Sequence, residues 1–180
     1  MLKYLLLLLT STIFMSSNVK KKVYAFSAQS RMQDWRIVND GVMGGLSTSS
    51  LRLTDSGHGQ FSGHVALANN GGFASVQLDA VVPLNSEVKY IIFRIKGDKK
   101  NYEFRLKSTL SQAESYVHLF KTSGEWQTIK IALAEFAPQY RGRKLNGANF
   151  NFSKIEQLSI LIANKQEEDF ELLLDYIGVE

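Results

Sequence analysis

The chain has 180 residues, which suits a single domain, and it carries 21 Lys and Arg against 17 Asp and Glu. Four of the lysines (Lys3 and Lys20–Lys22) lie in the first 25 residues, which hold no acidic residue, so the remainder is balanced at 21 − 4 = 17 basic against 17 acidic. A neutral domain lacks the basic surface that a nucleic-acid backbone requires, and this excludes nucleic acid as an expected partner. The absence of cysteine excludes disulfides, thiolate metal sites and thiol nucleophiles.

Residues 1–25 have the pattern of a leader. A short basic start, MLK, precedes the apolar run YLLLLLTSTIFM, which is shorter than the roughly 20 apolar residues of a membrane-spanning helix. The small-residue site VYA, ending at Ala25, predicts a cleaved signal peptide and export to the periplasm or cell envelope. Because Lys20–Lys22 follow the apolar run, an uncleaved membrane anchor with the domain on the cytoplasmic side stays open. A mitochondrial presequence is disfavoured, since such segments are rich in Arg and the first Arg here is Arg31.

From Trp35 onward, apolar residues alternate with polar ones in short runs that predict β-strands. In YEFRLKS, for example, Tyr102, Phe104 and Leu106 share one face of an extended chain, and charged residues occupy the other. The turn signals DSGHG, NNGG, KGDKKN and TSGEW separate such runs. In chain order, the predicted strands lie within residues 61–67, 73–82, 89–97, 102–108, 126–133, 157–164 and 170–179.

Helix has little room in this pattern. Only ALAEFAPQY (residues 132–140) could form one or two helical turns before Pro138. Short strands at regular spacing with polar turns predict an all-β fold, a sandwich or a barrel. We therefore expect one β-domain over residues 30–180.

Two glycine-rich stretches, NDGVMGGLS and NNGGFAS, each precede a predicted strand. A phosphate-binding loop is excluded, because it needs a Lys and a Ser or Thr at fixed positions before a helix. One interpretation is conformational, since Gly, Asn and Asp adopt positive φ at the lowest cost in turns. The other is that paired glycines let the backbone approach a second surface closely. The residues concerned are Asn39, Asp40, Gly41, Gly44, Gly45, Asn70, Gly71 and Gly72.

The sequence does not predict an enzyme. The histidines available as a general base are His58, His64 and His118, and no serine sits in a G-x-S-x-G elbow. The chain has no H-x-x-x-H pair, so no zinc site is expected, and no motif calls for a cofactor. Paired carboxylates of the glycosidase type stay open at this point, because such pairs meet in space rather than in sequence.

Aromatic residues and one basic tripeptide are candidates for binding. Arg141–Arg143 (RGR) is the most compact basic spot outside the leader, either a solvated loop or a clamp for an acidic group on a partner. Aromatic side chains could stack on a sugar, although aromatic residues are more often buried in a core. Those available are Trp35, Phe73, Trp126, Phe136 and Tyr140.

The chain resembles the complex I intermediate-associated protein 30 family over about 145 residues, nearly the whole predicted domain. The resemblance is most specific in W-R-I-V-N-D-G-V-M-G-G-L-S (Trp35–Ser47) and N-N-G-G-F-A-S-V (Asn69–Val76). Further matching stretches follow in the family's order: GQFSGHVAL, RIKGD followed by Tyr102, GEWQTI, FAPQYRGR and the ending DFELLLDYI.

The resemblance implies a galactose-binding-like jelly-roll sandwich. It also implies a non-catalytic role, because mitochondrial members of the family are assembly factors that hold membrane-arm intermediates of NADH:ubiquinone oxidoreductase. A leader of the export type would keep this chain from subunits on the cytoplasmic side of a membrane, although it could reach membrane subunits from outside.

Two hypotheses for function follow, and both involve binding without chemistry. The first is an assembly or chaperone-like factor for membrane protein complexes, whose partners are membrane subunits or assembly intermediates. Its contact surface would combine close backbone approach at glycines, apolar contact and arginine pairing, at Asp40, Met43, Gly44, Gly45, Asn70, Gly71, Gly72, Phe73, Arg141 and Arg143. The alternative is a carbohydrate-binding module of the cell envelope, in which aromatic stacking and the polar groups of Asn and Asp bind a glycan.

Overall fold

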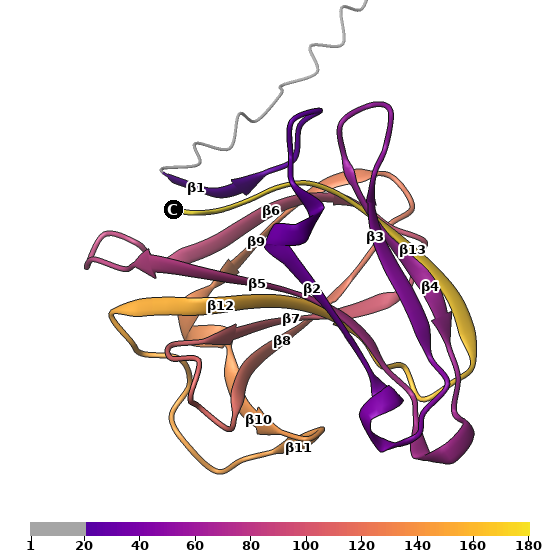
Figure 1. Ribbon diagram of the computed structural model, residues 1–180. Helices are drawn as coiled ribbons and strands as arrows, with labels where there is room; N and C mark the ends of the chain where they lie inside the picture. The colour runs from indigo at the N-terminus through magenta and orange to yellow at the C-terminus, as the bar shows by residue number, and fades with distance from the viewer. Residues whose placement is uncertain (1–20) are drawn as a thin grey trace, which may run out of the picture.

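The computed structural model describes residues 21–180, and of Val42 and Met43 it describes the backbone only. The chain forms two antiparallel sheets that pack face to face (Figure 1), so the predicted all-β sandwich is confirmed. The helical content of residues 21–180 is four short 3-10 turns: η1 (Met32–Asp34), η2 (Asp40–Met43), η3 (Ala68–Asn70) and η4 (Leu133–Glu135). The last of these falls within the stretch where the sequence predicted a helical turn.

One sheet has six strands in the order β3-β4-β13-β6-β9, with β1 added to the edge of β13. The long β13 pairs with β4 through its first half and with β6 and β1 through its second half. The strands span Lys21–Ala25 (β1), Thr48–Leu53 (β3), Gly59–Val65 (β4), Tyr90–Lys96 (β6), Trp126–Ala132 (β9) and Glu168–Val179 (β13).

The other sheet has seven strands in the order β11-β10-β8-β7-β12-β5-β2. Its centre is formed by β12, which pairs antiparallel with both β5 and β7. The strands span Trp35–Asn39 (β2), Ala74–Pro83 (β5), Asn101–Lys107 (β7), Ser115–Lys121 (β8), Ala137–Tyr140 (β10), Arg143–Lys144 (β11) and Lys154–Ile162 (β12).

The core lies between the sheets and follows from the two-residue alternation. Tyr102, Phe104 and Leu106 of β7 are fully buried, as predicted. The ring of Phe104 lies 4.7 Å from that of Phe93 on the facing sheet. Burying one such side chain contributes about 1.5–3 kcal/mol, so each of these rings adds to the attraction between the layers.

The register of the strands defines two ends of the sandwich. At the Asp40 end, β2 finishes at Asn39 opposite the first residue of β5, Ala74. At the terminal end, Lys21 of β1 pairs with Val179 of β13, so the start and the finish of the described chain lie together. Figure 1 places the turns after β2 and β4 at the lower right and the C-terminus at the left.

β1 lies inside the stretch 1–25 that the sequence analysis assigned to a leader. Tyr24 packs edge-on against Phe26 and Trp35, at centroid distances of 4.9 and 5.2 Å. Phe26 and Trp35 are in turn stacked at 5.6 Å and almost completely buried. The β-structure therefore begins ahead of residue 30, where the domain was expected to start. The rest of the predicted leader, residues 1–20, lies outside the described residues.

A chain that begins at Phe26, the product of cleavage after Ala25, should be less stable than one that begins at Lys20. Removing β1 removes Val23 and Tyr24, which are partly buried and pack against the hydrophobic core. We expect the free energy of unfolding to fall by about 2–4 kcal/mol, as for the loss of a large packed side chain. Urea denaturation followed by circular dichroism measures this, and identical midpoints for the two chains would contradict a packing role for β1.

Candidate functional site

The Asp40 carboxylate joins the two glycine-rich loops that the sequence singled out. Its side chain is buried, with only 5% of the residue exposed. Oδ1 accepts a hydrogen bond from the backbone N–H of Ser47 at 3.0 Å, and Oδ2 accepts one from the Ser47 hydroxyl at 2.5 Å. Oδ2 also accepts from the backbone N–H groups of Gly72 (2.6 Å) and Phe73 (3.3 Å). We call residues 40–47 the first signature loop and residues 66–73 the second.

Ser47 and Asn69 add direct contacts between these loops. The Ser47 hydroxyl accepts a hydrogen bond from the backbone N–H of Ala66 at 3.0 Å. The side-chain amide of Asn69 donates to the backbone carbonyl of Gly44 at 2.9 Å. Sequence reasoning missed both residues as functional positions, although both stand inside the family motifs. The available signal was their type, because Ser and Asn commonly bond to a neighbouring backbone in loops.

Positive φ explains only part of the glycine pattern. Gly44 has φ +85° and Gly72 has φ +128°, and Asn69 and Asn70 have φ of 56° and 59°. The conformational interpretation is confirmed at these glycines and at Asn70. It is wrong for Asn39, whose φ of −109° is ordinary extended backbone. It is also wrong for the other four residues to which it was applied, which do not have positive φ: Asp40, Gly41, Gly45 and Gly71.

Gly45 and Gly71 serve a different purpose, because they make room for the Asp40 side chain. A Cβ atom on Gly45 would lie 2.3 Å from Cγ of Asp40, and one on Gly71 would lie 2.6 Å from its Oδ2. Gly41, in contrast, has nothing within 4 Å of the position that a Cβ would take. The close approach that the sequence suggested for glycines therefore occurs within the protein, around one carboxylate.

The hydrogen bonds keep Asp40 ionised. Burial raises the pKa of this carboxyl, while the bonds from Ser47, Gly72 and Phe73 lower it, and the result is a pKa below the ordinary value for Asp. Because the folded-state pKa lies below that of the unfolded chain, the stabilisation is complete above the unfolded-state pKa. It is lost as the pH falls through the folded-state pKa.

The two signature loops, held together by the hydrogen bonds to Asp40, present an exposed surface at the Asp40 end of the sandwich. We call this surface the rim. Leu46 is 60% exposed and Leu67 is 41% exposed, unusually high for leucine. Phe73, predicted to offer apolar contact, is half-buried, and the side chain of Met43 lies outside the described residues. The exposed residues of the rim are Gly41, Gly44, Leu46, Leu67, Ala68, Asn69 and Asn70.

The arginines at 141 and 143 do not join this surface. Gln139 of β10 pairs with Ser115, at the start of β8. Lys121, at the finish of β8, pairs with Asn101 at the same end of the sheet as Asn39 and Ala74. The hairpin that carries Arg141 and Arg143 thus lies past the Ser115 end of β8, at the far edge of the seven-stranded sheet from β2. The structure divides the predicted contact surface into two separate regions.

The histidines are dispersed among ordinary polar contacts. His64 pairs with Asp169 at 2.8 Å, and His118 Nε2 lies 3.2 Å from a Glu135 carboxylate oxygen. His58 Nδ1 lies 2.9 Å from the hydroxyl of Ser56. Within residues 21–180, no group of three or more His, Asp or Glu side chains is placed to hold a metal ion. Over the same residues, no helix has the length and hydropathy of a transmembrane span.

Comparison with known proteins settles the family. The profile of the family Complex I intermediate-associated protein 30 (CIA30) matches residues 24–174. The chain belongs to this family. The predicted resemblance is therefore confirmed, and the matched region contains both signature loops.

Curated relatives include two proteins named "Probable complex I intermediate-associated protein 30, mitochondrial", from Caenorhabditis elegans and Caenorhabditis briggsae. Each is 27% identical over 189 residues, which cover 92% of this chain and 56% of the relative. The chain thus spans about half the length of these relatives. An uncharacterized protein of Schizosaccharomyces pombe is 32% identical over 173 residues, covering 81% of this chain and 77% of that protein.

Solved structures confirm the galactose-binding-like jelly roll. The family 11 carbohydrate-binding module of the Clostridium thermocellum cellulase Lic26A-Cel5E superposes with a TM-score of 0.65 at 17% identity, covering 91% of this chain and 95% of the module. The agarase AgWH50C gives a TM-score of 0.59 at 13% identity, covering 89% of this chain and 26% of the agarase. At such identities the likeness establishes the fold alone.

The prediction of export to the periplasm or cell envelope is wrong. The relatives matched across most of this chain are named mitochondrial, which conflicts with a secretory signal. That prediction rested on an apolar run and a small-residue site near the start of the sequence. It did not use the folded domain, through which the relatives are matched. The alternative of a membrane anchor rested on residues 1–20, which lie outside the described residues.

Replacing Asp40 by Asn should destabilise the protein by about 2–4 kcal/mol at pH 7, because an amide cannot replace a carboxylate that accepts four hydrogen bonds. The effect should stay constant between pH 5 and pH 8 and shrink below about pH 4, where the unfolded chain binds protons first. Urea denaturation at several pH values measures it. Asp34→Asn, at an exposed position, is the control, and a loss that is equal for both variants or independent of pH would contradict the account.

Gly45→Ala and Gly41→Ala form a matched pair, since neither glycine has positive φ. The methyl group at Gly45 would collide with Asp40, and we expect a loss of about 1–3 kcal/mol, as for overpacking. At Gly41 the methyl group meets open space, so the change should stay within about 0.5 kcal/mol. Thermal denaturation of the two variants distinguishes them, and equal melting temperatures would show that the approach to Asp40 is unimportant.

Proposed function

We propose that the protein is a non-catalytic binding protein that acts as an assembly or chaperone-like factor for membrane protein complexes such as NADH:ubiquinone oxidoreductase. Membership of the family and the names of the relatives support this role. The observation that carries the proposal is the set of hydrogen bonds to the Asp40 carboxylate. These bonds fix the two signature loops, which are distant in sequence, before any partner binds. A preformed surface loses less conformational entropy on binding, so more of the contact energy remains as affinity.

The rim has the chemistry of a protein-binding surface. Leu46 and Leu67 supply exposed apolar contact, and Asn69 and Asn70 supply polar groups beside them. Interfaces combine an apolar centre with a polar periphery in this way. The partner that fits is an apolar segment with free backbone or amide groups, as exposed on an unassembled membrane subunit.

The carbohydrate-binding alternative has weaker support from the side chains. Trp35, offered as a stacking platform, is 6% exposed. Trp126 is covered by Arg94, whose guanidinium carbon lies 4.5 Å from the ring centroid, and by His58, whose ring lies 4.6 Å away. Trp35 is therefore too buried for sugar stacking, and the ring of Trp126 is already in contact with two side chains.

The open face of the seven-stranded sheet also differs from a sugar platform. Its residues are charged, amide-bearing, hydroxylated or aliphatic, and Arg36 is held there by Asp79 (3.2 Å) and Gln77 (3.1 Å). The outward positions on its described strands β2, β5, β7, β8 and β12 include no aromatic residue: Arg36, Val38, Ser75, Gln77, Asp79, Val81, Glu103, Arg105, Lys107, Ser115, Val117, Leu119, Gln157, Ser159 and Leu161.

Crosslinked capture from gently solubilised native membranes tests the proposal. The tagged chain should recover membrane subunits of respiratory complexes above a tag-only control. With the double variant Leu46→Asp/Leu67→Asp, the amount of membrane subunit recovered should fall at least about tenfold, because two charges are placed at an apolar contact. Its melting temperature should stay unchanged, since both side chains are exposed.

Leu119→Asp is the matched control, because Leu119 is 58% exposed on β8, which β7, β12 and β5 separate from β2 and the rim. It should recover the same subunits as the wild type. Equal losses for the rim variant and the Leu119 variant would remove the rim from the proposal. Recovery of no membrane subunit by the wild type would reject the assembly role, and a glycan screen would then address the alternative.

A further inference from the structure

The hairpin formed by β10 and β11 carries three cations without acidic partners. Arg141, Arg143 and Lys144 are all exposed, and none forms an ion pair with another residue of the described chain, 21–180. The chain from residue 136 to residue 155 contains no Asp or Glu. The hairpin is therefore a concentrated positive charge with no internal compensation.

Exposed apolar side chains flank these cations on both sides. Tyr140 is 41% exposed and Leu145 is 43% exposed. The Arg141 guanidinium lies over the Tyr140 ring, 5.4 Å from its centroid. The order Tyr-Arg-Gly-Arg-Lys-Leu thus places apolar and cationic groups together at one protruding turn.

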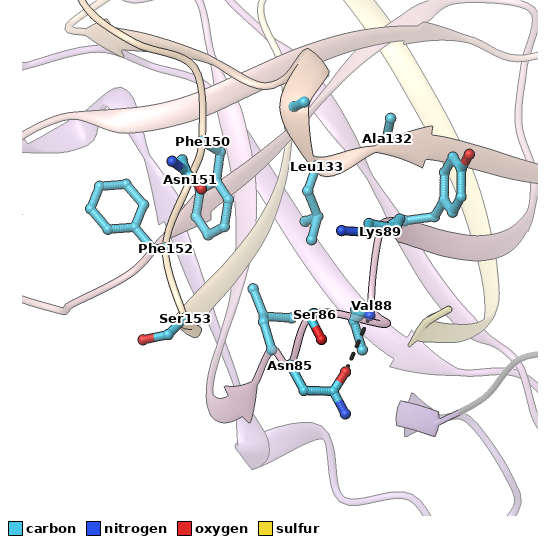
Figure 2. Close-up of a pocket in the computed structure, with 13 residues that line it drawn as sticks. Asn85, Ser86, Val88, Lys89, Ala132, Leu133, Phe150, Asn151, Phe152 and Ser153 are labelled. Carbon is cyan, nitrogen blue, oxygen red and sulfur yellow. Dashed lines mark hydrogen bonds between the residues drawn. The ribbon is translucent and has the colours of Figure 1, made fainter.

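Two open hollows continue this surface across the terminal end. The first, about 660 Å³, is lined by Tyr90, Leu133, Phe150 and Phe152, and Figure 2 shows Lys89 beside it. The second, about 370 Å³, is lined by Leu145 and shares Phe152 with the first. Tyr90 and Phe152 are 36% and 40% exposed, so exposed apolar groups extend from the hairpin over both hollows.

Further cations lie at the same end. Lys21 and Lys22 are exposed at the start of β1, and Lys89 is exposed beside Tyr90. The apolar run YLLLLLTSTIFM precedes them in the sequence, separated from Lys21 by only five residues. The point at which this run enters the domain is therefore part of the same amphipathic end.

We propose that the terminal end rests on an anionic phospholipid surface, with Arg141, Arg143 and Lys144 against the headgroups and Tyr140 and Leu145 in the interfacial layer. Lys and Arg near an anionic bilayer attract it, and aromatic side chains favour the interfacial region. Cations spread over a hairpin, a loop and the chain start fit an extended surface better than one acidic group. The inference is independent of the proposed function, which rests on the rim at the other end.

A local fluorescence measurement on the full chain tests this orientation. Because the chain has no cysteine, Leu145→Cys gives a single site for the polarity-sensitive dye NBD. With vesicles of phosphatidylcholine and phosphatidylserine, the dye at 145 should brighten and shift to shorter wavelength, and phosphatidylcholine alone should produce much less change. The dye on Leu46→Cys, at the rim, should not respond. Attachment through residues 1–20 would also bring residue 145 toward the bilayer, because that segment enters the domain at the terminal end, and the charge variants separate this cause from the hairpin.

Charge variants decide whether the hairpin causes the response. The triple variant Arg141→Gln, Arg143→Gln and Lys144→Gln should abolish the fluorescence response of the dye at residue 145. Each removed charge should lower the affinity for the vesicles about fivefold. The matched triple Arg52→Gln, Lys121→Gln and Lys165→Gln removes exposed cations elsewhere and should leave it intact. Equal responses at 46 and 145, or an unchanged response in the hairpin variant, would overturn the proposal. A response to soluble polyglutamate but not to vesicles would assign the hairpin to an acidic protein and would also overturn it.

Discussion

The arrangement at one end of this sandwich depends on a buried charge that must be satisfied. A carboxylate removed from water is costly unless it is fully hydrogen-bonded, and Asp40 meets this requirement with donors from Ser47, Gly72 and Phe73. Those donors belong to two loops, so satisfying one residue fixes the position of both. Glycine at positions 45 and 71 follows from the same constraint, since any side chain there would occupy the space of the carboxylate.

Sequence reasoning recovered what depends on local pattern and on family motifs. The alternation in stretches such as residues 102–107 gave the strands and their buried faces, and the motifs gave the family and the jelly roll. It could not show that Asp40 reaches Gly72, because the hydrogen bonds of a carboxylate are set by tertiary folding and leave no periodic signal. For the same reason, Gly45 was not distinguishable from a turn glycine such as Gly44. The first strand was hidden because two of its five residues are lysines that follow an apolar run.

The structure also separates features that the sequence had grouped. The rim and the arginine hairpin lie at different ends of the sandwich, so they cannot clamp one small group on a partner. Each surface has its own chemistry. The rim has exposed leucines beside amides on preformed loops, and the hairpin has cations beside aromatic and aliphatic side chains. A factor that holds a membrane subunit would use both, one surface for the subunit and one for the lipid around it. The carbohydrate-binding modules share the fold of this chain, while its own Trp35 is buried and its Trp126 packs against Arg94 and His58.

The central claim is that one carboxylate holds both signature loops, and amide hydrogen exchange tests it most directly. In the wild type, the amides of Ser47, Gly72 and Phe73 should be protected. In Asp40→Asn, exchange should accelerate in both loops together, by at least about tenfold, while strand β12 keeps its protection. Acceleration confined to the first loop, or unchanged protection at Gly72, would show that the loops are held independently and would contradict the account.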